Sequence, residues 1–209
     1  MNTNSKEVII LVHGLWMKGP ELFYLRYKLM RQGYKVYQFH YSSIFKTPEE
    51  NAFKLHQFVS AIDAPVIHFV AHSLGGIVVT HLFQHHEIKQ SGKVVMIGTP
   101  LNGSAAAVHL SKNKCLRFLL GKSIINGLLG DAPKWSGKRK LCVIAGVKGL
   151  GAGQIFASHV MTEPNDGTVN LHETQLEKAN ESYEVPRSHF LLLISNDVVK
   201  IIIKFLVKE

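Results

Sequence analysis

The stretch VIHFVAHSLGGIVVTHLF, residues Val66 to Phe83, changes its hydrophobic pattern at a single serine. Apolar residues follow one another closely before Ser73, as in a buried strand, and recur at helical spacing after it. A serine on a tight strand-to-helix turn adopts a strained backbone conformation that exposes its hydroxyl group. Such a turn requires small residues two positions before and after the serine, and here these are Ala71 and Gly75. We therefore predict that Ser73 is an exposed nucleophile at the end of a strand.

Short apolar strands alternate with helical patterns along the rest of the chain. The predicted strands are residues 8–12, 35–41, 66–71, 93–97, 141–145 and 182–185. The predicted helices are residues 21–32, 48–62, 74–86 and 193–207. Because such strands pair in parallel through right-handed crossovers, helices are expected on both faces of the sheet. The sequence predicts an α/β fold with a doubly wound, mainly parallel sheet of about six strands, in a single domain over residues 1–209.

The segment between the fourth and fifth predicted strands exceeds 40 residues, too many for a plain crossover. We interpret residues 102–140 as a helical, lid-like insertion. Within it, an apolar stripe bordered by lysines and arginines lies along one helical face and consists of Leu116, Leu119, Leu120, Ile124 and Leu128. Such a stripe is typical of contact with an anionic membrane surface, but also of a helix that packs on the sheet as ordinary core. Both interpretations stay open.

Composition and charge restrict the class of protein. A chain with 46% hydrophobic and 19% charged residues is typical of a soluble globular domain. The net charge of +9 is compatible with an anionic partner, but no zinc-ligand spacing, aromatic RNP-like strand or basic region before heptads accompanies it. We therefore expect no nucleic-acid partner. The apolar runs are far shorter than the roughly 20 residues that a membrane-spanning helix needs, so no span is expected.

Targeting and cofactor signals are also missing from the sequence. The N-terminal MNTNSKE has no basic region of the signal-peptide type, which predicts a cytoplasmic location. In that compartment Cys115 and Cys142 are expected to be free thiols. The glycine-rich residues 145–154 do not open a helix with an acidic ribose partner, so we expect a flexible loop and no dinucleotide. No His/Cys/Asp cluster shows metal-ligand spacing, and we expect neither cofactor nor metal.

A serine nucleophile of this kind needs an imidazole to accept its proton and a carboxylate to orient the imidazole, both from later strand ends. Asp63 precedes the strand of the serine, and Asp197 lies on the last predicted helix. Two aspartates remain, Asp131 in the insertion and Asp166 in the turn-rich loop after the strand at residues 141–145. Asp166 is the better candidate, although an Asp-Gly turn would also account for it.

The base and the oxyanion donors follow from the same positional argument. Among 12 histidines, His189 falls between the last strand and the last helix, where the base is required, although a local hydrogen bond at a helix start would also explain it. Less suitable by position are His172, His159, His85 and His86. The first strand ends at His13-Gly14, where the glycine lets the backbone turn. The N–H groups of Leu15 and Leu74 are therefore expected to form an oxyanion hole.

The segments LVHGLW, VAHSLGG, IGTPLNGS, NDGTV and SHFLL together resemble the α/β-hydrolase superfamily, in particular its small lipase and esterase members. These include minimal bacterial lipases that also carry Ala-x-Ser-x-Gly. The resemblance extends over residues 8–205. It implies a sheet without the N-terminal hairpin of larger members, a catalytic triad and an oxyanion hole. The residues it implies are Ser73, Asp166 and His189 for the triad, with Leu15 and Leu74 as the donors.

Two classes of function are compatible with these residues. The first is a serine hydrolase of the esterase or lipase type, acting on a small-molecule or lipid ester, with thioester hydrolysis or acyl transfer as variants of the same chemistry. The second is a hydrolase fold with vestigial chemistry that serves as a binding or membrane-docking module. An intact set of Ser, Asp and His favours the first class.

Overall fold

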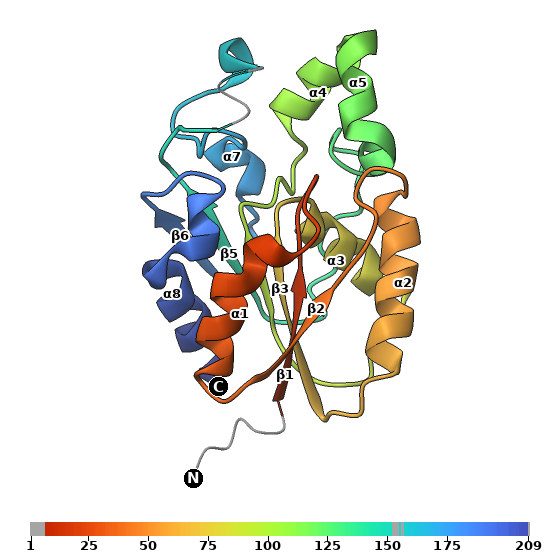
Figure 1. Cartoon of the computed structure of the whole chain (residues 1–209), viewed down its shortest axis with the longest axis vertical. Coiled ribbons are helices and arrows are strands. Elements are labelled where there is room, and N and C mark those ends of the chain that lie inside the picture. The colour runs from red at the N-terminus through yellow and green to blue at the C-terminus, as the bar shows by residue number, and fades with distance from the viewer. Residues whose placement is uncertain (1–6, 152–154, 156, 209) are drawn as a thin grey trace.

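A parallel six-stranded sheet forms the centre of the protein in the computed structural model, which describes residues 7–151, 155 and 157–208. The strand order is β2-β1-β3-β4-β5-β6, and each neighbouring pair is parallel (Figure 1). The strands are β1 (Glu7–Val12), β2 (Lys35–Phe39), β3 (Val66–His72), β4 (Val94–Ile97), β5 (Leu141–Gly146) and β6 (Glu181–Val185). The predicted doubly wound sheet is confirmed, with boundaries within two residues of those expected.

Helices cover both faces of this sheet. On one face lie α1 (Phe23–Met30) and α8 (Asn196–Val207), and on the other lie α2 (Pro48–Ser60) and α3 (Leu74–His85) (Figure 1). Alternate residues of β1 supply the two cores, because successive side chains of a strand point to opposite faces. Both faces of the strand are therefore buried, as a doubly wound sheet requires. The shorter helical turns are η2 (Pro20–Leu22), η4 (Ser158–Val160), α7 (Leu171–Thr174) and η5 (Leu191–Ile194).

The start of α2 is fixed by its own sequence. The hydroxyl of Thr47 accepts a hydrogen bond from the N–H of Glu50 at 3.1 Å, and the Glu50 carboxylate accepts from the N–H of Thr47 at 2.8 Å. Pro48 occupies the first helical position, where its missing N–H costs nothing. This capping box holds the first turn of α2 in a defined orientation against α3.

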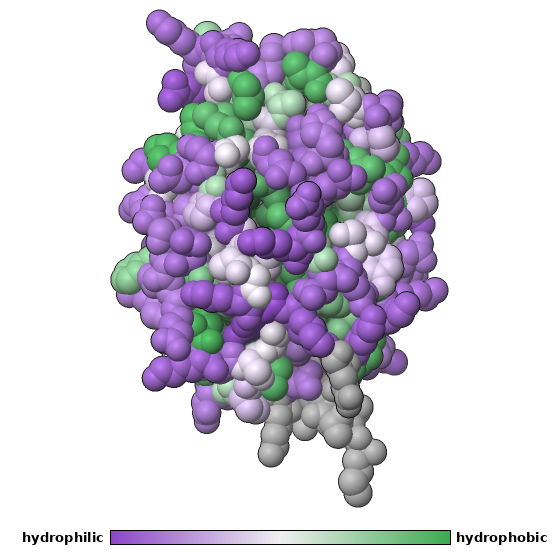
Figure 2. Space-filling model, turned by 180° about the vertical axis from the view of Figure 1, so that it is seen from behind, coloured by the Kyte–Doolittle hydropathy of each residue, from purple (hydrophilic) through white to green (hydrophobic). Residues whose placement is uncertain are grey.

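The insertion between β4 and β5 contains α4 (Ala105–Lys112), α5 (Lys114–Leu120) and η3 (Gly121–Ile124). The predicted apolar stripe is largely buried here, since Leu120, Ile124 and Leu128 pack with Leu74 and Ile77 of α3. Core packing, not membrane contact, therefore accounts for these three leucine and isoleucine side chains. Viewed from behind, hydrophobic patches lie between hydrophilic side chains, several of them toward the end of the molecule that carries α4 and α5 (Figure 2).

Three further expectations concern the cysteines, the glycine-rich loop and membrane-spanning helices. Cys115 and Cys142 are free thiols, as predicted. Part of the predicted glycine-rich loop, residues 152–154, lies outside the described residues. Within the described part of the chain, every helix is too short or too polar to cross a membrane.

Arg139 joins the end of the insertion to the sheet. Its guanidinium group donates hydrogen bonds to the carbonyl oxygens of Ile67, at 2.6 Å, and Gln90. The same group lies 4.9 Å from the ring centroid of Phe83. Because hydrogen bonds of a charged donor to buried acceptors contribute about 1.5–3 kcal/mol, Arg139→Met should lower the free energy of unfolding by about 2 kcal/mol. Urea unfolding measures this change.

The matched control is Lys138→Met, which removes the same charge from an exposed neighbouring position. It should change the free energy of unfolding by less than about 0.5 kcal/mol, as surface substitutions usually do. Equal losses in the two variants would contradict a structural role for Arg139.

Candidate active site

Ser73 lies on a sharp turn between β3 and α3 that only a restricted sequence can form. Its backbone has φ 52° and ψ −125°, a strained conformation for a residue with a side chain. A Cβ atom at Gly75 would lie 2.5 Å from the carbonyl oxygens of Val12 and His13. At Gly76 it would lie 2.2 Å from Oγ1 of Thr99. The glycines after the serine are thus required by the close approach of α3 to β1 and to the loop after β4.

The turn lies where the strand order of the sheet reverses. β1 pairs with both β2 and β3, so the loops after β1 and β3 leave the sheet side by side. In open α/β sheets this switch point is the usual place for a ligand. A cavity of about 240 Å³ lies there, and Leu15, Ser73 and His189 all line it. Most of the other lining residues are apolar, among them Ala107, Leu110, Leu120, Leu128, Val169 and Phe190.

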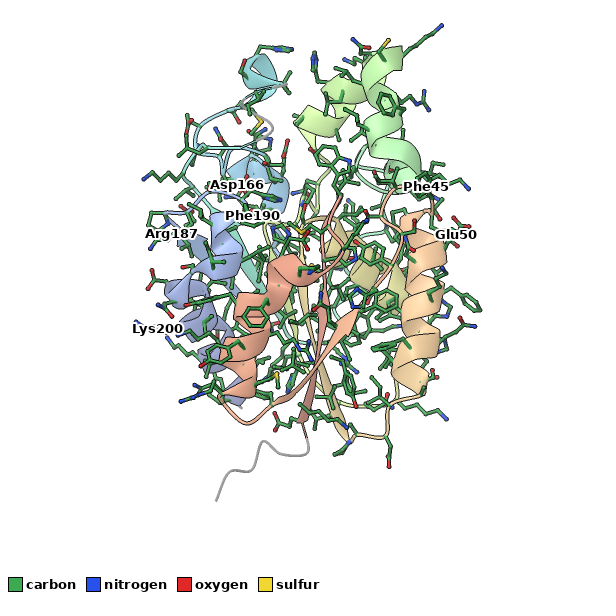
Figure 3. All side chains as sticks on the ribbon, in the orientation of Figure 1. Phe45, Glu50, Asp166, Arg187, Phe190 and Lys200 are labelled. Atoms are coloured by element: carbon green, nitrogen blue, oxygen red, sulfur yellow. The ribbon has the colours of Figure 1, made fainter. Side chains whose placement is uncertain are left out.

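Asp166 and His189 form a buried pair at the edge of this cavity. Nδ1 of His189 lies 2.6 Å from Oδ2 of Asp166, and the Asp166 side chain is 1% exposed. The second carboxylate oxygen accepts hydrogen bonds from the N–H groups of Thr168 at 2.9 Å and Val169 at 2.7 Å. The N–H of His189 also donates to the carbonyl of Asp166 at 2.9 Å. In Figure 3, Asp166 and Phe190, the residue after His189, lie close together beyond the carboxyl ends of the strands.

The loop after β1 is held by three separate contacts. The hydroxyl of Tyr41 donates to the carbonyl oxygen of His13 at 2.7 Å, and the two rings stack. The N–H of Trp16, whose φ is 61°, donates to Oγ of Ser43 at 3.1 Å. The indole N–H of Trp16 donates to the carbonyl of Leu119 in α5 at 2.7 Å. This loop is therefore fixed both to the chain after β2 and to the insertion.

The two residues expected as oxyanion donors lie in the loop after β1 and at the start of α3. Leu15 belongs to the fixed loop and lines the cavity. Leu74 is the first residue of α3, so its N–H has no carbonyl partner within the helix. The positive end of the α3 dipole lies at the same place.

Solved structures with the same arrangement of strands and helices identify the fold. The mature form of the Bacillus licheniformis lipase BlEst2 is similar over 96% of this chain and 92% of that chain, with a TM-score of 0.73 and 19% identity. The metagenomic carboxyl esterase MGS0156 is similar over 90% of this chain and 65% of that chain, with a TM-score of 0.75 and 17% identity. The chain has the α/β-hydrolase fold.

A third similar structure is the phospholipase PlaB from Legionella pneumophila, with a TM-score of 0.61 and 19% identity over 81% of this chain and 45% of that chain. No protein-family model and no curated protein matches the sequence. The α/β-hydrolase fold is therefore established by three-dimensional similarity.

The other sequence candidates lie in different places in this α/β-hydrolase fold. Asp131 accepts hydrogen bonds from the N–H groups of Asn126 and Gly127 and closes a turn in the insertion. His159 contacts His109 of α4, with 3.2 Å between ring nitrogens. His85 and His86 lie at the end of α3, and His172 lies in α7. Only Asp166 has a carboxylate hydrogen-bonded to His189 among the described residues.

Two glycines that position this pair were not singled out from the sequence. A Cβ atom at Gly98, which follows β4 with φ 56°, would lie 3.0 Å from two ring atoms of His189. A Cβ atom at Gly146, the last residue of β5, would lie 2.7 Å from Cβ of Asp166. The sequence signal that could have indicated them is a glycine at the carboxyl end of β4 and of β5, the two strands beside the Asp166–His189 pair.

His72 is a further residue that the sequence did not mark. It is 1% exposed, its ring centroid lies 4.6 Å from that of His189, and its Nε2–H donates to the carbonyl of His189 at 3.2 Å. Burial, with a smaller contribution from the nearby His189, holds the pKa of His72 well below its usual value. Because the His72 ring is neutral, it adds no electrostatic repulsion to the neighbouring His189 ring when His189 takes up a proton.

The low pKa of His72 gives the unfolding free energy a defined pH dependence. The unfolded chain takes up a proton on this ring below pH 6.5, the ordinary value, while the folded protein does not. The free energy of unfolding should therefore fall as the pH drops below that value, by up to about 1.4 kcal/mol per pH unit from this one group. Urea unfolding between about pH 7 and pH 5 measures the slope.

The variant His72→Gln isolates this contribution, because glutamine keeps an amide donor for the carbonyl of His189 without a titrating ring. Its slope should be shallower than that of the original protein. The buried His13 and His81, whose pKa values burial also lowers, keep their own contributions in both proteins. An unchanged slope would contradict the neutral state of His72.

Proposed function

We propose that the protein is a serine hydrolase that cleaves a carboxylic ester through an acyl-enzyme on Ser73. The observation that carries this proposal is the buried Asp166–His189 pair, which borders the same cavity as a serine in a strained strand-to-helix turn. A hydroxyl, an acid and an imidazole from the segments after β3, β5 and β6 would form a triad in the chain order Ser, Asp, His.

Each residue of the triad has a distinct role in the proposed reaction. Asp166 accepts the Nδ1–H of His189, which leaves the Nε2 lone pair free for the proton of Ser73. The serine oxygen then attacks the ester carbonyl carbon, and His189 passes the proton to the departing alcohol. In the second half-reaction His189 takes a proton from water as the water attacks the acyl carbon. The bond to Ser73 then breaks, His189 returns the proton to the serine oxygen, and the carboxylic acid is released.

The charge that develops on the carbonyl oxygen requires donors that are already in place. The N–H groups of Leu15 and Leu74 fill this role, supported by the dipole of α3. The hydrogen bonds of Tyr41 and Ser43 keep the Leu15 loop in place before substrate arrives. Such fixed donors need no reorganisation during the reaction, which is the main source of their effect.

The cavity favours an acyl chain as the bound group. Its wall is largely made of aliphatic side chains from the insertion and from the loop that carries Asp166. The similar solved structures described as a lipase, a carboxyl esterase and a phospholipase support an ester substrate. Thioester hydrolysis and acyl transfer would use the same acyl-enzyme and differ only in the leaving or accepting group.

Contact with an anionic membrane stays a prediction. Phe118 of α5 is 70% exposed and Ile125 is 48% exposed. Exposed basic side chains lie next to them in the chain, at Lys112, Lys114, Arg117 and Lys122. These residues, rather than the buried stripe, would form the surface that meets a lipid headgroup layer.

Covalent labelling with a fluorophosphonate probe tests the proposed nucleophile. The original protein should be labelled on one residue and should hydrolyse p-nitrophenyl esters. Ser73→Ala should abolish both, and Asp166→Asn should lower turnover by about 10⁴-fold, as loss of the triad carboxylate does elsewhere.

Asp131→Asn is the matched control for the acid, since in the described part of the chain the Asp131 carboxylate accepts hydrogen bonds from the backbone N–H groups of Asn126 and Gly127 within the insertion. It should keep turnover within about threefold of the original protein. A folded protein that resists labelling would favour the vestigial binding module, and loss of activity in Asp131→Asn alone would exclude Asp166 as the acid.

The proposed acyl site makes a second prediction about chain length. Ala107 of α4 is 4% exposed and lines the cavity, so Ala107→Leu should fill part of the space for the acyl chain. The ratio of kcat/KM for octanoate to acetate esters should fall by about tenfold or more, because a few methylene groups contribute several kcal/mol in an apolar pocket.

Ala105→Leu adds the same group to the first turn of the same helix, away from the lining of the cavity. Its octanoate-to-acetate ratio should match that of the original protein. A parallel fall in both variants would show that the acyl chain binds elsewhere.

A further inference from the structure

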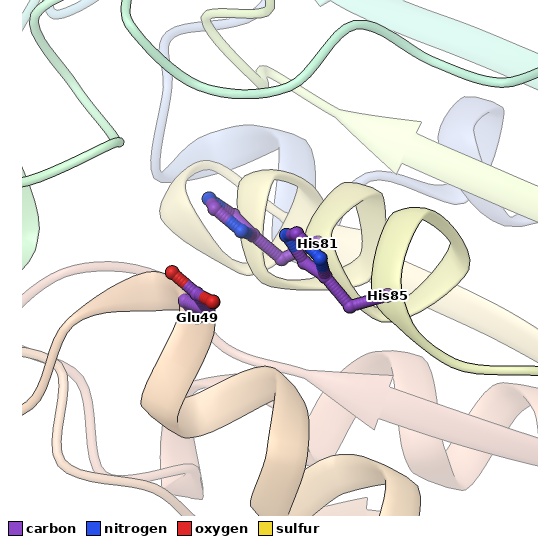
Figure 4. A group of neighbouring side chains, drawn as sticks. All are labelled: Glu49, His81 and His85. Carbon is purple, nitrogen blue, oxygen red and sulfur yellow. The ribbon is translucent and has the colours of Figure 1, made fainter.

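Three potential metal ligands meet on the far half of α3, away from the catalytic turn. The ligand atoms of Glu49, His81 and His85 all lie within 4.8 Å of one another. Figure 4 shows the carboxylate of Glu49, on α2, turned toward the two imidazole rings on α3. Eight residues of helix separate Ser73 from His81, which corresponds to about 12 Å along the axis. The cluster is therefore distinct from the proposed active site.

Local structure explains why these side chains converge. His81 and His85 are four residues apart, so they lie on the same face of α3. Glu49 belongs to the first turn of α2, which the Thr47–Glu50 capping box holds in place. The two helices pack against each other. All three ligand positions are thus set by helices with defined ends.

The hydrogen bonding of His81 matches that of a metal-binding histidine. Its side chain is 1% exposed, and Nε2–H donates to the carbonyl oxygen of Asn126 at 2.7 Å. This bond fixes the tautomer, so Nδ1 carries a lone pair. Nδ1 is buried and has no hydrogen-bond partner among the described residues. Metal-binding histidines commonly donate their second ring N–H to a backbone carbonyl in this way.

The carbonyl of Asn126 is itself held in position. Asn126 has φ 48°, and its N–H donates to the carboxylate of Asp131 at 3.0 Å. The turn therefore presents its carbonyl to His81 as a fixed acceptor. An unpartnered buried nitrogen costs free energy, and a cation with an empty coordination position would relieve that cost.

We propose that Glu49, His81 and His85 bind one divalent transition-metal ion of the zinc class. Two imidazole nitrogens and one carboxylate oxygen are a donor set that suits Zn²⁺ and its neighbours, and a water completes the tetrahedron. Glu49 and His85 are exposed, so the ion enters from solvent and exchanges the water without disturbing the core. No spacing signal in the sequence points to this set, because Glu49 comes from a different helix than the two histidines.

The bound ion would connect three parts of the chain. Glu49 belongs to α2 and the two histidines belong to α3. The Asn126 carbonyl connects the turn at residues 126–131 of the insertion through His81. That part of the insertion includes Leu128, which lines the cavity of the proposed active site. The role of the metal is thus structural, since it stabilises the turn around Asn126 in the insertion without contacting Ser73.

Titration of tag-free, metal-stripped protein with Co²⁺, followed by visible absorption, tests the proposal. One ion per chain should give the intense spectrum of four-coordinate Co²⁺, Zn²⁺ should displace it, and either ion should raise the melting temperature. Because Glu49 and His85 are exposed, His85→Ala and Glu49→Gln should fold normally by circular dichroism. Each should weaken Co²⁺ binding by at least about tenfold.

His56→Ala is the matched control. His56 lies on α2 and stacks on His86, with 4.5 Å between the ring centroids. The substitution therefore removes a nearby histidine that does not belong to the cluster. It should leave Co²⁺ affinity unchanged. Unchanged affinity in both cluster variants, loss of binding in His56→Ala, or a pale six-coordinate Co²⁺ spectrum would overturn the proposal. Fluorophosphonate labelling of Ser73 should be equal in all these variants, which separates this result from the fate of the proposed esterase activity.

Discussion

The close approach of α3 to the central strands is the constraint on which the rest of the site depends. Gly75 lies against the carbonyl groups at the end of β1, and Gly76 lies against Thr99 after β4. Without side chains at these positions, the helix can begin directly beside the ends of β1 and β4, the two strands that flank β3. Ser73 is then forced into its strained conformation, and the N-terminus of α3 opens into the cavity. Two close approaches, at Gly75 and Gly76, thus place the hydroxyl and a helix terminus together.

The same requirement for close packing recurs around the Asp166–His189 pair. Gly98 and Gly146 leave room for His189 and Asp166 at the ends of β4 and β5. The Asp166 carboxylate is then surrounded by backbone N–H donors, which offset the cost of burying its charge. The candidate site is therefore built from strand ends whose small residues leave room for the side chains of Asp166 and His189 from later loops.

The strands and the principal candidates could be predicted from the sequence because their signals are local. Each strand is a short apolar run, and the turn at Ser73 is specified by residues two positions away. The course of the insertion could not be predicted, since an amphipathic stripe does not reveal whether protein or lipid covers it. The stripe is largely buried against Leu74 and Ile77. The roles of His72 and Gly98 depend on contacts with His189, which is far away in the chain.

The two tryptophans of the chain occupy contrasting environments. Trp135 is 2% exposed and packs edge-on against Phe83 in the core. Trp16 is 46% exposed, lines the cavity, and hydrogen-bonds to α5 through its indole N–H. Because Trp135 is shielded from water and Trp16 is half-exposed, Trp135 should emit at shorter wavelengths than Trp16. A bound group that excludes water from Trp16 would shift the emission of Trp16 to shorter wavelengths, whereas unfolding would shift that of Trp135 to longer wavelengths, so the two events would move the spectrum in opposite directions.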